Sequence, residues 1–212
     1  FTIVLPEHDA VIAMTGETSN MQGGLDLVWE HLLPAMKPAP LPADAAAHAR
    51  LSERLAALAL PLPVGKPARE TAARVSGRTF AIAPGKHGIT SVKLDFGDGG
   101  ATFTARADGT EHRVACGAGK WVEGDAAFPD TPPRLLAGGA PPPGTRHKLA
   151  ASGVWKDENA FEMTWRYIET PHHDTVTCRF EGDAVKVTFV SSLAAKRGKP
   201  GDPRPALSGR MS

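Results

Sequence analysis

Apolar and polar residues alternate with a period of two along most of the second half of the chain. Phe161, Met163 and Trp165, for example, alternate with polar neighbours. A period of two with one polar face is typical of antiparallel strands that cover a core on one side. The pattern predicts strands near residues 77–83, 90–97, 101–106, 111–116, 120–123, 149–155, 160–169, 173–181, 184–191 and 207–211.

Tight-turn sequences separate several of these strands. The segments 98–100, 108–109 and 181–183 each contain glycine beside aspartate, a combination that supplies the positive φ of short hairpins. Hairpins in this number favour closure into an antiparallel, up-and-down β-barrel of about eight strands, because closure removes the exposed edges. Pro/Gly-rich stretches at 129–144 and 194–205 are expected to be long loops. The inward face should carry Phe161, Met163, Trp165, Val176, Cys178, Phe180, Val185 and Val187.

The first 36 residues follow a different pattern. Two apolar runs, 1–5 and 10–14, flank a polar turn, which predicts a hairpin whose strands are buried on both faces. Ser19 as N-cap and Gln22 at the capping-box position then begin a helix. Its apolar stripe comprises Met21, Leu25, Val28, Trp29, Leu32 and Met36. One helix cannot cover both faces of such strands, so a covering partner is expected.

Residues 37–75 are rich in proline and alanine. Closely spaced prolines stiffen the start of this connector. Residues 43–60 indicate an Ala-rich helix, which ends at Pro61 because proline cannot continue the hydrogen-bond ladder. The chain is therefore expected to comprise a hairpin and helix over 1–36, a linker with one helix over 37–75, and a β-barrel over 76–212. The linker helix should carry one apolar side formed by Leu51, Leu55 and Leu58.

Composition excludes some classes of partner. A formal net charge of +1 provides no field to attract nucleic acid or an acidic membrane. No run of about 18 apolar residues occurs, so no membrane span is predicted. The chain opens in a strand at Phe1, which suggests an excised piece of a longer protein. Cys116 and Cys178 exclude a disulfide framework and a thiolate zinc site, and either pair across the barrel or remain buried thiols.

The titratable residues form no recognisable catalytic set. The densest cluster is His172-His173-Asp174, but adjacent histidines on a strand point to opposite faces, which disfavours one shared metal ion. The segment 196–199 is interpreted as a solvated basic loop. No cofactor or metal is assigned. Convergence inside or at the mouth of a barrel would bring together four further residues, although their spacing does not require it: His87, His112, His147 and Glu162.

Tryptophans are the candidate ligand-binding residues. A small barrel can hold one apolar molecule, and Trp121, Trp155 and Trp165 lie in the barrel region. Plain core packing is the commoner role of such residues. Neither Gly-x-Ser-x-Gly nor Ser-x-x-Lys occurs. No catalytic residue is therefore assigned, and the chain by itself is expected to be inactive as a serine hydrolase.

Two blocks of sequence carry a resemblance. Residues 1–15 and 21–36 resemble the end of serine β-lactamase-related hydrolases of penicillin-binding-protein fold. In that family a hairpin and a C-terminal helix close the catalytic domain, and the catalytic motifs lie earlier. Residues 76–80, 91–96, 164–180 and 207–210 are similar to the lipocalin-like C-terminal domain that some of these hydrolases carry.

The resemblance implies the main functional expectation. The chain would be the non-catalytic C-terminal region of such a hydrolase, with a missing N-terminal catalytic domain. Its barrel would support that domain, shape the substrate entrance or mediate homo-oligomerisation. The alternative is a lipocalin-like module that binds a small ligand. A third hypothesis is an independent enzyme that uses His172, His173 and Asp174.

Overall fold

The computed structural model describes residues 1–16, 18, 20–129, 145–192, 202 and 204–212. These residues form two compact units, Phe1–Pro61 and Leu62–Ser212. Residues 62–75, which the sequence analysis assigned to a linker, therefore belong to the unit that contains the barrel.

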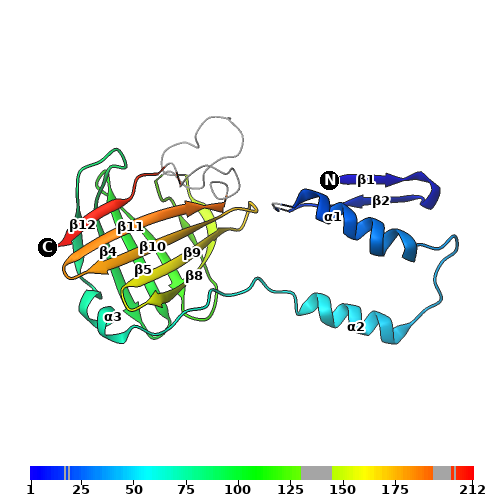
Figure 1. Cartoon of the computed structure of the whole chain (residues 1–212), viewed down its shortest axis with the longest axis horizontal. Helices are drawn as coiled ribbons and strands as arrows, with labels where there is room; N and C mark the ends of the chain where they lie inside the picture. Colours follow the sequence, from blue (N-terminus) through cyan, green and yellow to red (C-terminus); the bar gives the residue numbers. More distant parts are fainter. Residues whose placement is uncertain (17, 19, 130–144, 193–201, 203) are drawn as a thin grey trace. The chain divides into compact units, whose positions relative to one another are not determined.

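The first unit is a hairpin with two helical segments (Figure 1). Strand β1 (Thr2–Leu5) pairs antiparallel with β2 (Ala10–Ala13). Helix α1 (Met21–Leu27) is capped by the side chain of Asn20, whereas the predicted cap Ser19 lies outside the described residues. The chain continues as a π-helical turn (Val28–Leu32) and a 3-10 turn (Leu33–Ala35), and helix α2 (Ala45–Ala56) follows.

The hairpin strands are not buried on both faces, which corrects the sequence-based expectation. Val4 and Val11 are 63% and 66% exposed. Among the described residues of this unit, only Val28 is buried. The physical reason is size, because two short strands and two helices of seven and twelve residues enclose too little volume for a core. The covering partner remains a prediction.

The second unit is a closed β-barrel, which confirms the predicted fold class. Nine strands form its ring in the order β6-β5-β4-β3-β12-β11-β10-β9-β8, and β6 closes onto β8. A tenth strand, β7, pairs with β8. The strands are β3 (Thr79–Ile82), β4 (Ile89–Gly97), β5 (Gly100–Ala107), β6 (Thr110–Gly117), β7 (Val122–Ala126), β8 (His147–Asp157), β9 (Ala160–Tyr167), β10 (His173–Glu181), β11 (Ala184–Ser191) and β12 (Leu207–Met211).

The barrel departs from a simple up-and-down order at its closure. Gly117 of β6 pairs in parallel with Ser152 of β8. The Ser152 hydroxyl also donates a hydrogen bond to the Gly117 carbonyl, at 3.0 Å. Every other described pair of the sheet is antiparallel. The sheet is therefore mixed, because β7 lies along the first half of β8 and leaves β6 to meet that strand farther on.

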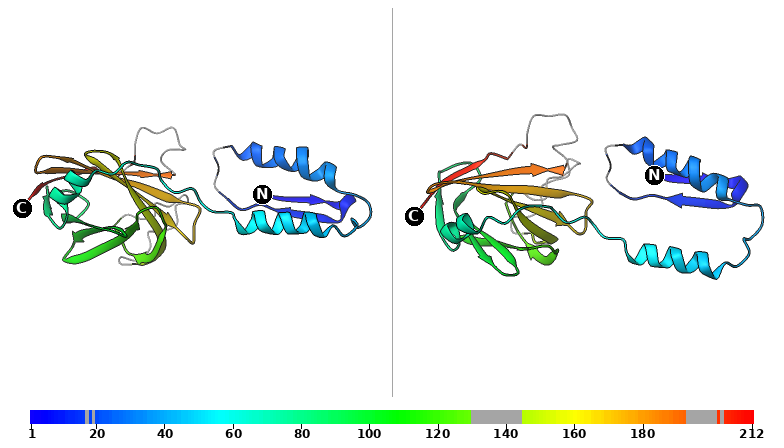
Figure 2. Two further views of the ribbon diagram at one scale, coloured as in Figure 1. Left: turned by 90° about the horizontal axis from the view of Figure 1, so that it is seen from below. Right: turned by 60° about the horizontal axis from the view of Figure 1, so that its bottom comes forward.

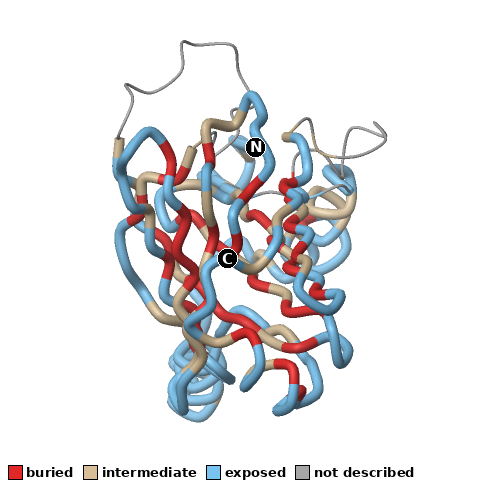
Figure 3. Tube along the Cα trace, turned by 90° about the vertical axis from the view of Figure 1, so that its left-hand side faces the viewer, coloured by how far each residue is buried: buried red, intermediate tan, exposed pale blue. Residues whose placement is uncertain are grey.

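The predicted register is confirmed. The eight residues expected on the inward face are all buried. Buried and exposed positions alternate along the strands (Figure 3). Antiparallel pairing sets Val176 opposite Met163 and Cys178 opposite Phe161, so apolar side chains of neighbouring strands share one face. The largest fully buried side chains in the barrel are Trp165, Phe80, Phe103, Phe180, Leu94 and Met163.

Helix α3 (Arg69–Val75) covers one end of the barrel, which we call the α3 end (Figure 2). Val75 is fully buried in the core. The Phe96 N–H donates to the Ser76 hydroxyl at 2.9 Å, which ties the helix to the end of β4. The sequence pattern does not predict α3, because seven residues without a side-chain N-cap carry little periodic signal. The opposite end, at the β5–β6 turn, is called the mouth.

No helix among the described residues is long and apolar enough to cross a membrane.

Candidate functional site

A pocket of about 310 Å³ opens at the α3 end of the barrel. We call it the end pocket. Its walls come from the segment before α3, from α3 itself, from the ends of β4 and β5, from the turn after β6, and from β8 and β9. They comprise Gly65, Lys66, Pro67, Ala68, Arg69, Ala72, Phe96, Gly97, Gly100, Ala118, Gly119, Gly153, Val154, Trp155 and Phe161.

Glycines allow the backbone to form this pocket. The Lys66 N–H donates to the Trp155 carbonyl at 2.7 Å, which holds the segment before α3 against β8. A Cβ on Gly65 would lie 2.2 Å from the same carbonyl, so only glycine permits this approach. A Cβ on Gly153 would lie 2.5 Å from the Phe161 ring. The pocket thus lies where glycines, which have no side chain, form part of its walls.

Three aromatic rings line the apolar part of the end pocket. The ring centroids of Phe96 and Phe161 are 4.9 Å apart in an edge-to-face arrangement. Trp155 lies 5.2 Å from Phe96 and 5.3 Å from Phe161. Such contacts fix the rings relative to one another and present apolar surface to a ligand.

The rim of the end pocket is basic. Lys66 and Arg69 line it, and both are exposed. Neither forms an ion pair with any described residue. The pocket wall contains no acidic residue. The rim therefore offers two positive charges to a negatively charged group.

A buried ion-pair network lies at the mouth. Arg204 donates two hydrogen bonds to Asp174, each 2.8 Å, and two to Asp202, at 2.8 and 2.7 Å. The Tyr167 hydroxyl donates to Asp174 at 2.6 Å, and the Ser191 N–H donates to Asp202 at 2.7 Å. The carboxylates of Asp174 and Asp202 are 0% and 2% exposed.

The charges of this network neutralise one another in part. Burial alone would lower the pKa of Arg204, but its hydrogen bonds to Asp202 and Asp174 hold that pKa above the ordinary value. Burial alone would raise the pKa of Asp202, yet the hydrogen bonds from Arg204 hold it below the ordinary value. One cation thus faces two carboxylates, so the network does not attract an anion.

The three candidate tryptophans lie in different environments. Trp155 lines the end pocket. Trp165 is fully buried in the core and lines neither described pocket. Trp121 is half-buried, and the guanidinium of Arg166 lies 5.5 Å from its ring centroid. The sequence pattern does not single out Lys66, Arg69 or Phe96. The glycines near the strand ends are the feature of the sequence that could have indicated this pocket.

The titratable candidates do not converge. Asp174 joins the network with Arg204, whereas His172 and His173 are half-buried beside it. Each of the remaining candidates has a different partner. His87 accepts a hydrogen bond from the Ile89 N–H, and Glu162 forms an ion pair with Lys156. The ring of His112 contacts Phe128, and that of His147 contacts Tyr167. In the described part of the chain, no three His, Cys, Asp or Glu side chains have the arrangement of a metal site. The predicted basic loop 196–199 lies outside the described residues.

Both cysteines are buried free thiols. Burial raises the pKa of Cys116 to about 12, and it raises the pKa of Cys178 as well. The thiols therefore stay protonated at neutral pH and behave as small apolar side chains.

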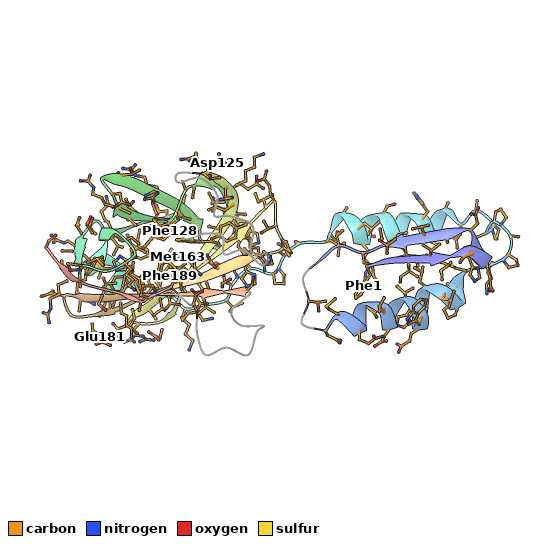
Figure 4. The ribbon with its side chains drawn as sticks, turned by 90° about the horizontal axis from the view of Figure 1, so that it is seen from above. Phe1, Asp125, Phe128, Met163, Glu181 and Phe189 are labelled. Atoms are coloured by element: carbon orange, nitrogen blue, oxygen red, sulfur yellow. The ribbon has the colours of Figure 1, made fainter. Side chains whose placement is uncertain are left out.

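A second hollow, of about 550 Å³, lies along β3, β12, β11 and β10. It is lined by Ala81, Ile82, Ala83, Arg179, Glu181, Ala184, Val185, Lys186, Ser208, Gly209 and Arg210. Glu181 is labelled in Figure 4. We call this hollow the wall groove. It has no aromatic lining residue, and its charges are of both signs.

Comparisons with known proteins identify no family. No protein-family model and no curated protein matches the chain. Among solved structures, this chain is similar to the fatty-acid-binding protein isolated from Manduca sexta. The match has 11% sequence identity, covers 65% of this chain and 99% of that protein, and has a TM-score of 0.39.

These comparisons contradict the main functional expectation. They return no β-lactamase-related protein, and the matched structure is a fatty-acid-binding protein rather than part of a hydrolase. The interpretation of the chain as the non-catalytic end of a serine hydrolase is therefore wrong as a statement of function. A missing catalytic domain and an oligomer have no support among these findings.

Proposed function

We propose that the barrel unit is a binding module for a small amphipathic ligand that has an apolar body and an anionic group. The observation that carries this proposal is the end pocket, which combines three aromatic rings with a rim of Lys66 and Arg69. Ligand sites in proteins are concave, mainly apolar and supplied with a few polar groups. The end pocket has this composition.

The volume narrows the ligand class. About 310 Å³ lies at the lower end of the usual range for small-molecule sites. The pocket therefore suits a short or compact molecule, such as an aromatic or short-chain carboxylate or sulfonate. Its apolar body would contact Phe96, Trp155 and Phe161, while its anionic group would lie between the two basic side chains of the rim.

Filling the pocket tests the proposal. Ala118 is exposed and lines the end pocket, so Ala118→Trp should occupy it without disturbing the core. We expect this variant to weaken binding of anilinonaphthalene sulfonate, measured by isothermal titration calorimetry, by at least about tenfold. Ala81→Trp is the matched control, because Ala81 is an exposed residue of the wall groove. Loss of binding in the control alone would place the probe in the wall groove and refute the proposal.

Removal of the rim charges tests the anionic part of the ligand. The double variant Lys66→Ala/Arg69→Ala should weaken binding of the same probe by about tenfold, because exposed charge pairs each contribute roughly 0.2–1 kcal/mol. Binding to the unaltered protein should also weaken with added salt. Lys186→Ala/Arg210→Ala removes the same charge from the wall groove and should leave affinity within about twofold. Equal effects of the two double variants would show only a general effect of net charge.

A further inference from the structure

Phe128 places an aromatic ring inside the mouth of the barrel from outside the sheet. The last ladder pair of β7 joins Ala126 to His147, so Phe128 follows the end of that strand. Its side chain is nevertheless only 6% exposed. Figure 4 shows Phe128 within the barrel together with Met163 and Phe189.

Rings from four strands surround Phe128. Its centroid lies 5.1 Å from Trp165 of β9 in an edge-to-face arrangement, and 5.8 Å from Phe189 of β11. Phe103 of β5 lies at 5.9 Å and His112 of β6 at 6.2 Å. The strand ladders fix these four residues, whereas the ring of Phe128 enters their enclosure from a connection.

The polar groups of the enclosure favour a neutral guest. The indole N–H of Trp165 is buried and has no hydrogen-bond partner among the described residues. Arg204 lies over the ring of Phe189 at 5.0 Å, but Asp174 and Asp202 already bind its guanidinium. An anion at the mouth would therefore meet a surplus of negative charge.

We propose that the mouth holds a second binding site, for a flat neutral aromatic molecule with a hydrogen-bond acceptor, and that Phe128 occupies this site in the unliganded protein. The guest takes the place of the Phe128 ring among Phe103, Trp165 and Phe189, and its acceptor receives the Trp165 N–H. This site is separate from the end pocket and does not depend on it. The two sites differ in ligand charge.

Coumarin is a suitable probe, since it is flat and neutral and carries a carbonyl acceptor. Calorimetry should show that Phe128→Ala binds coumarin at least about tenfold tighter than the unaltered protein, because the competing ring is gone. An apolar enclosure emptied in this way accepts aromatic molecules. Phe128→Leu serves if the alanine variant does not fold, and it should also tighten binding.

Two controls make this result specific. Phe80→Ala removes a buried core ring that packs against Phe180 of β10, with ring centroids 5.8 Å apart, so it should leave coumarin affinity within about twofold. Ala118→Trp blocks the end pocket and should leave coumarin binding unchanged. A failure of the mouth site can therefore be distinguished from a failure of the end pocket. Equal tightening in Phe80→Ala and Phe128→Ala, or no tightening in either Phe128 variant, would overturn the proposal.

The role of the Trp165 N–H has its own measurement. Naphthalene has a similar shape but no acceptor, so the protein should bind coumarin several-fold tighter than naphthalene. In Trp165→Phe, which lacks the donor, this difference should disappear. A difference that persists in the variant would show that the Trp165 N–H does not contact the guest and would refute the assigned ligand chemistry.

Discussion

Replacement of Trp165 by alanine should lower the free energy of unfolding by about 3–5 kcal/mol. Trp165 is fully buried and lies on the inward face of β9, opposite Asp174 in the ladder. Its ring lies 5.8 Å from Phe103 and 5.1 Å from Phe128. The loss combines the removal of a large apolar surface from the core with the cost of the cavity that remains, because neighbouring strands cannot close it.

Urea unfolding of the variant measures this loss. Lys186→Ala is the control, since Lys186 is exposed on the outer face of β11 and its replacement should change the free energy of unfolding by less than about 0.5 kcal/mol. In both variants the free energy of unfolding should fall with urea concentration at the same slope as in the unaltered protein, because the total surface exposed on unfolding hardly changes. Equal shifts of the two midpoints would mean that the register described for β9 and β11 is incorrect by one residue.

The second large effect is expected at Arg204. Arg204→Met should lower the free energy of unfolding by about 3–5 kcal/mol at neutral pH, because it leaves the buried carboxylates of Asp174 and Asp202 without their cation. Arg179→Met is the matched control, since its ion pair with Asp157 is exposed, at 49% and 50%, and should contribute less than about 1 kcal/mol. Similar losses in both variants would show that burial of the Arg204 network has no energetic consequence.

The free energy of unfolding should depend on pH in opposite directions in the unaltered protein and in Arg204→Met. In the unaltered protein the folded-state pKa of Asp202 lies below its unfolded value. Asp202 therefore contributes stability above the unfolded value, near pH 4, and this contribution is lost as the pH falls through the folded pKa. In Arg204→Met, two buried carboxylates repel each other, so uptake of a proton relieves the folded state. The variant should recover part of its stability between neutral pH and about pH 4, opposite in direction to the contribution of Asp202 in the unaltered protein.

A double variant checks the cause of that loss. Arg204→Met/Asp174→Asn removes one of the two negative charges together with the cation. It should be more stable at neutral pH than Arg204→Met, because only one carboxylate remains in the network. A double variant that is less stable than the single variant would indicate that packing of the guanidinium against Phe189, rather than charge, accounts for the loss.

Local periodicity was sufficient to predict the wall of the barrel. The inward face of β9, β10 and β11 follows from alternation, because successive side chains of a strand point to opposite faces whatever the strand pairs with. The turns were equally local. Asp108 and Gly109 both have positive φ, at 49° and 75°, as their sequence indicated. The sequence by itself therefore determined the strands, several of their turns and the inward-facing residues of the barrel wall.

Only the tertiary structure decided which residues meet at the end pocket and at the mouth. The end pocket joins Lys66 to Trp155 through a hydrogen bond between segments far apart in the chain, and no period links them. Phe128 enters the core from a connection, where side-chain direction follows no repeat. Arg204 meets Asp174 thirty residues away. Alternation states which face a strand residue occupies, but it carries no information on which distant segment closes the barrel or fills its ends, because those contacts depend on the pairing of all nine strands of the ring.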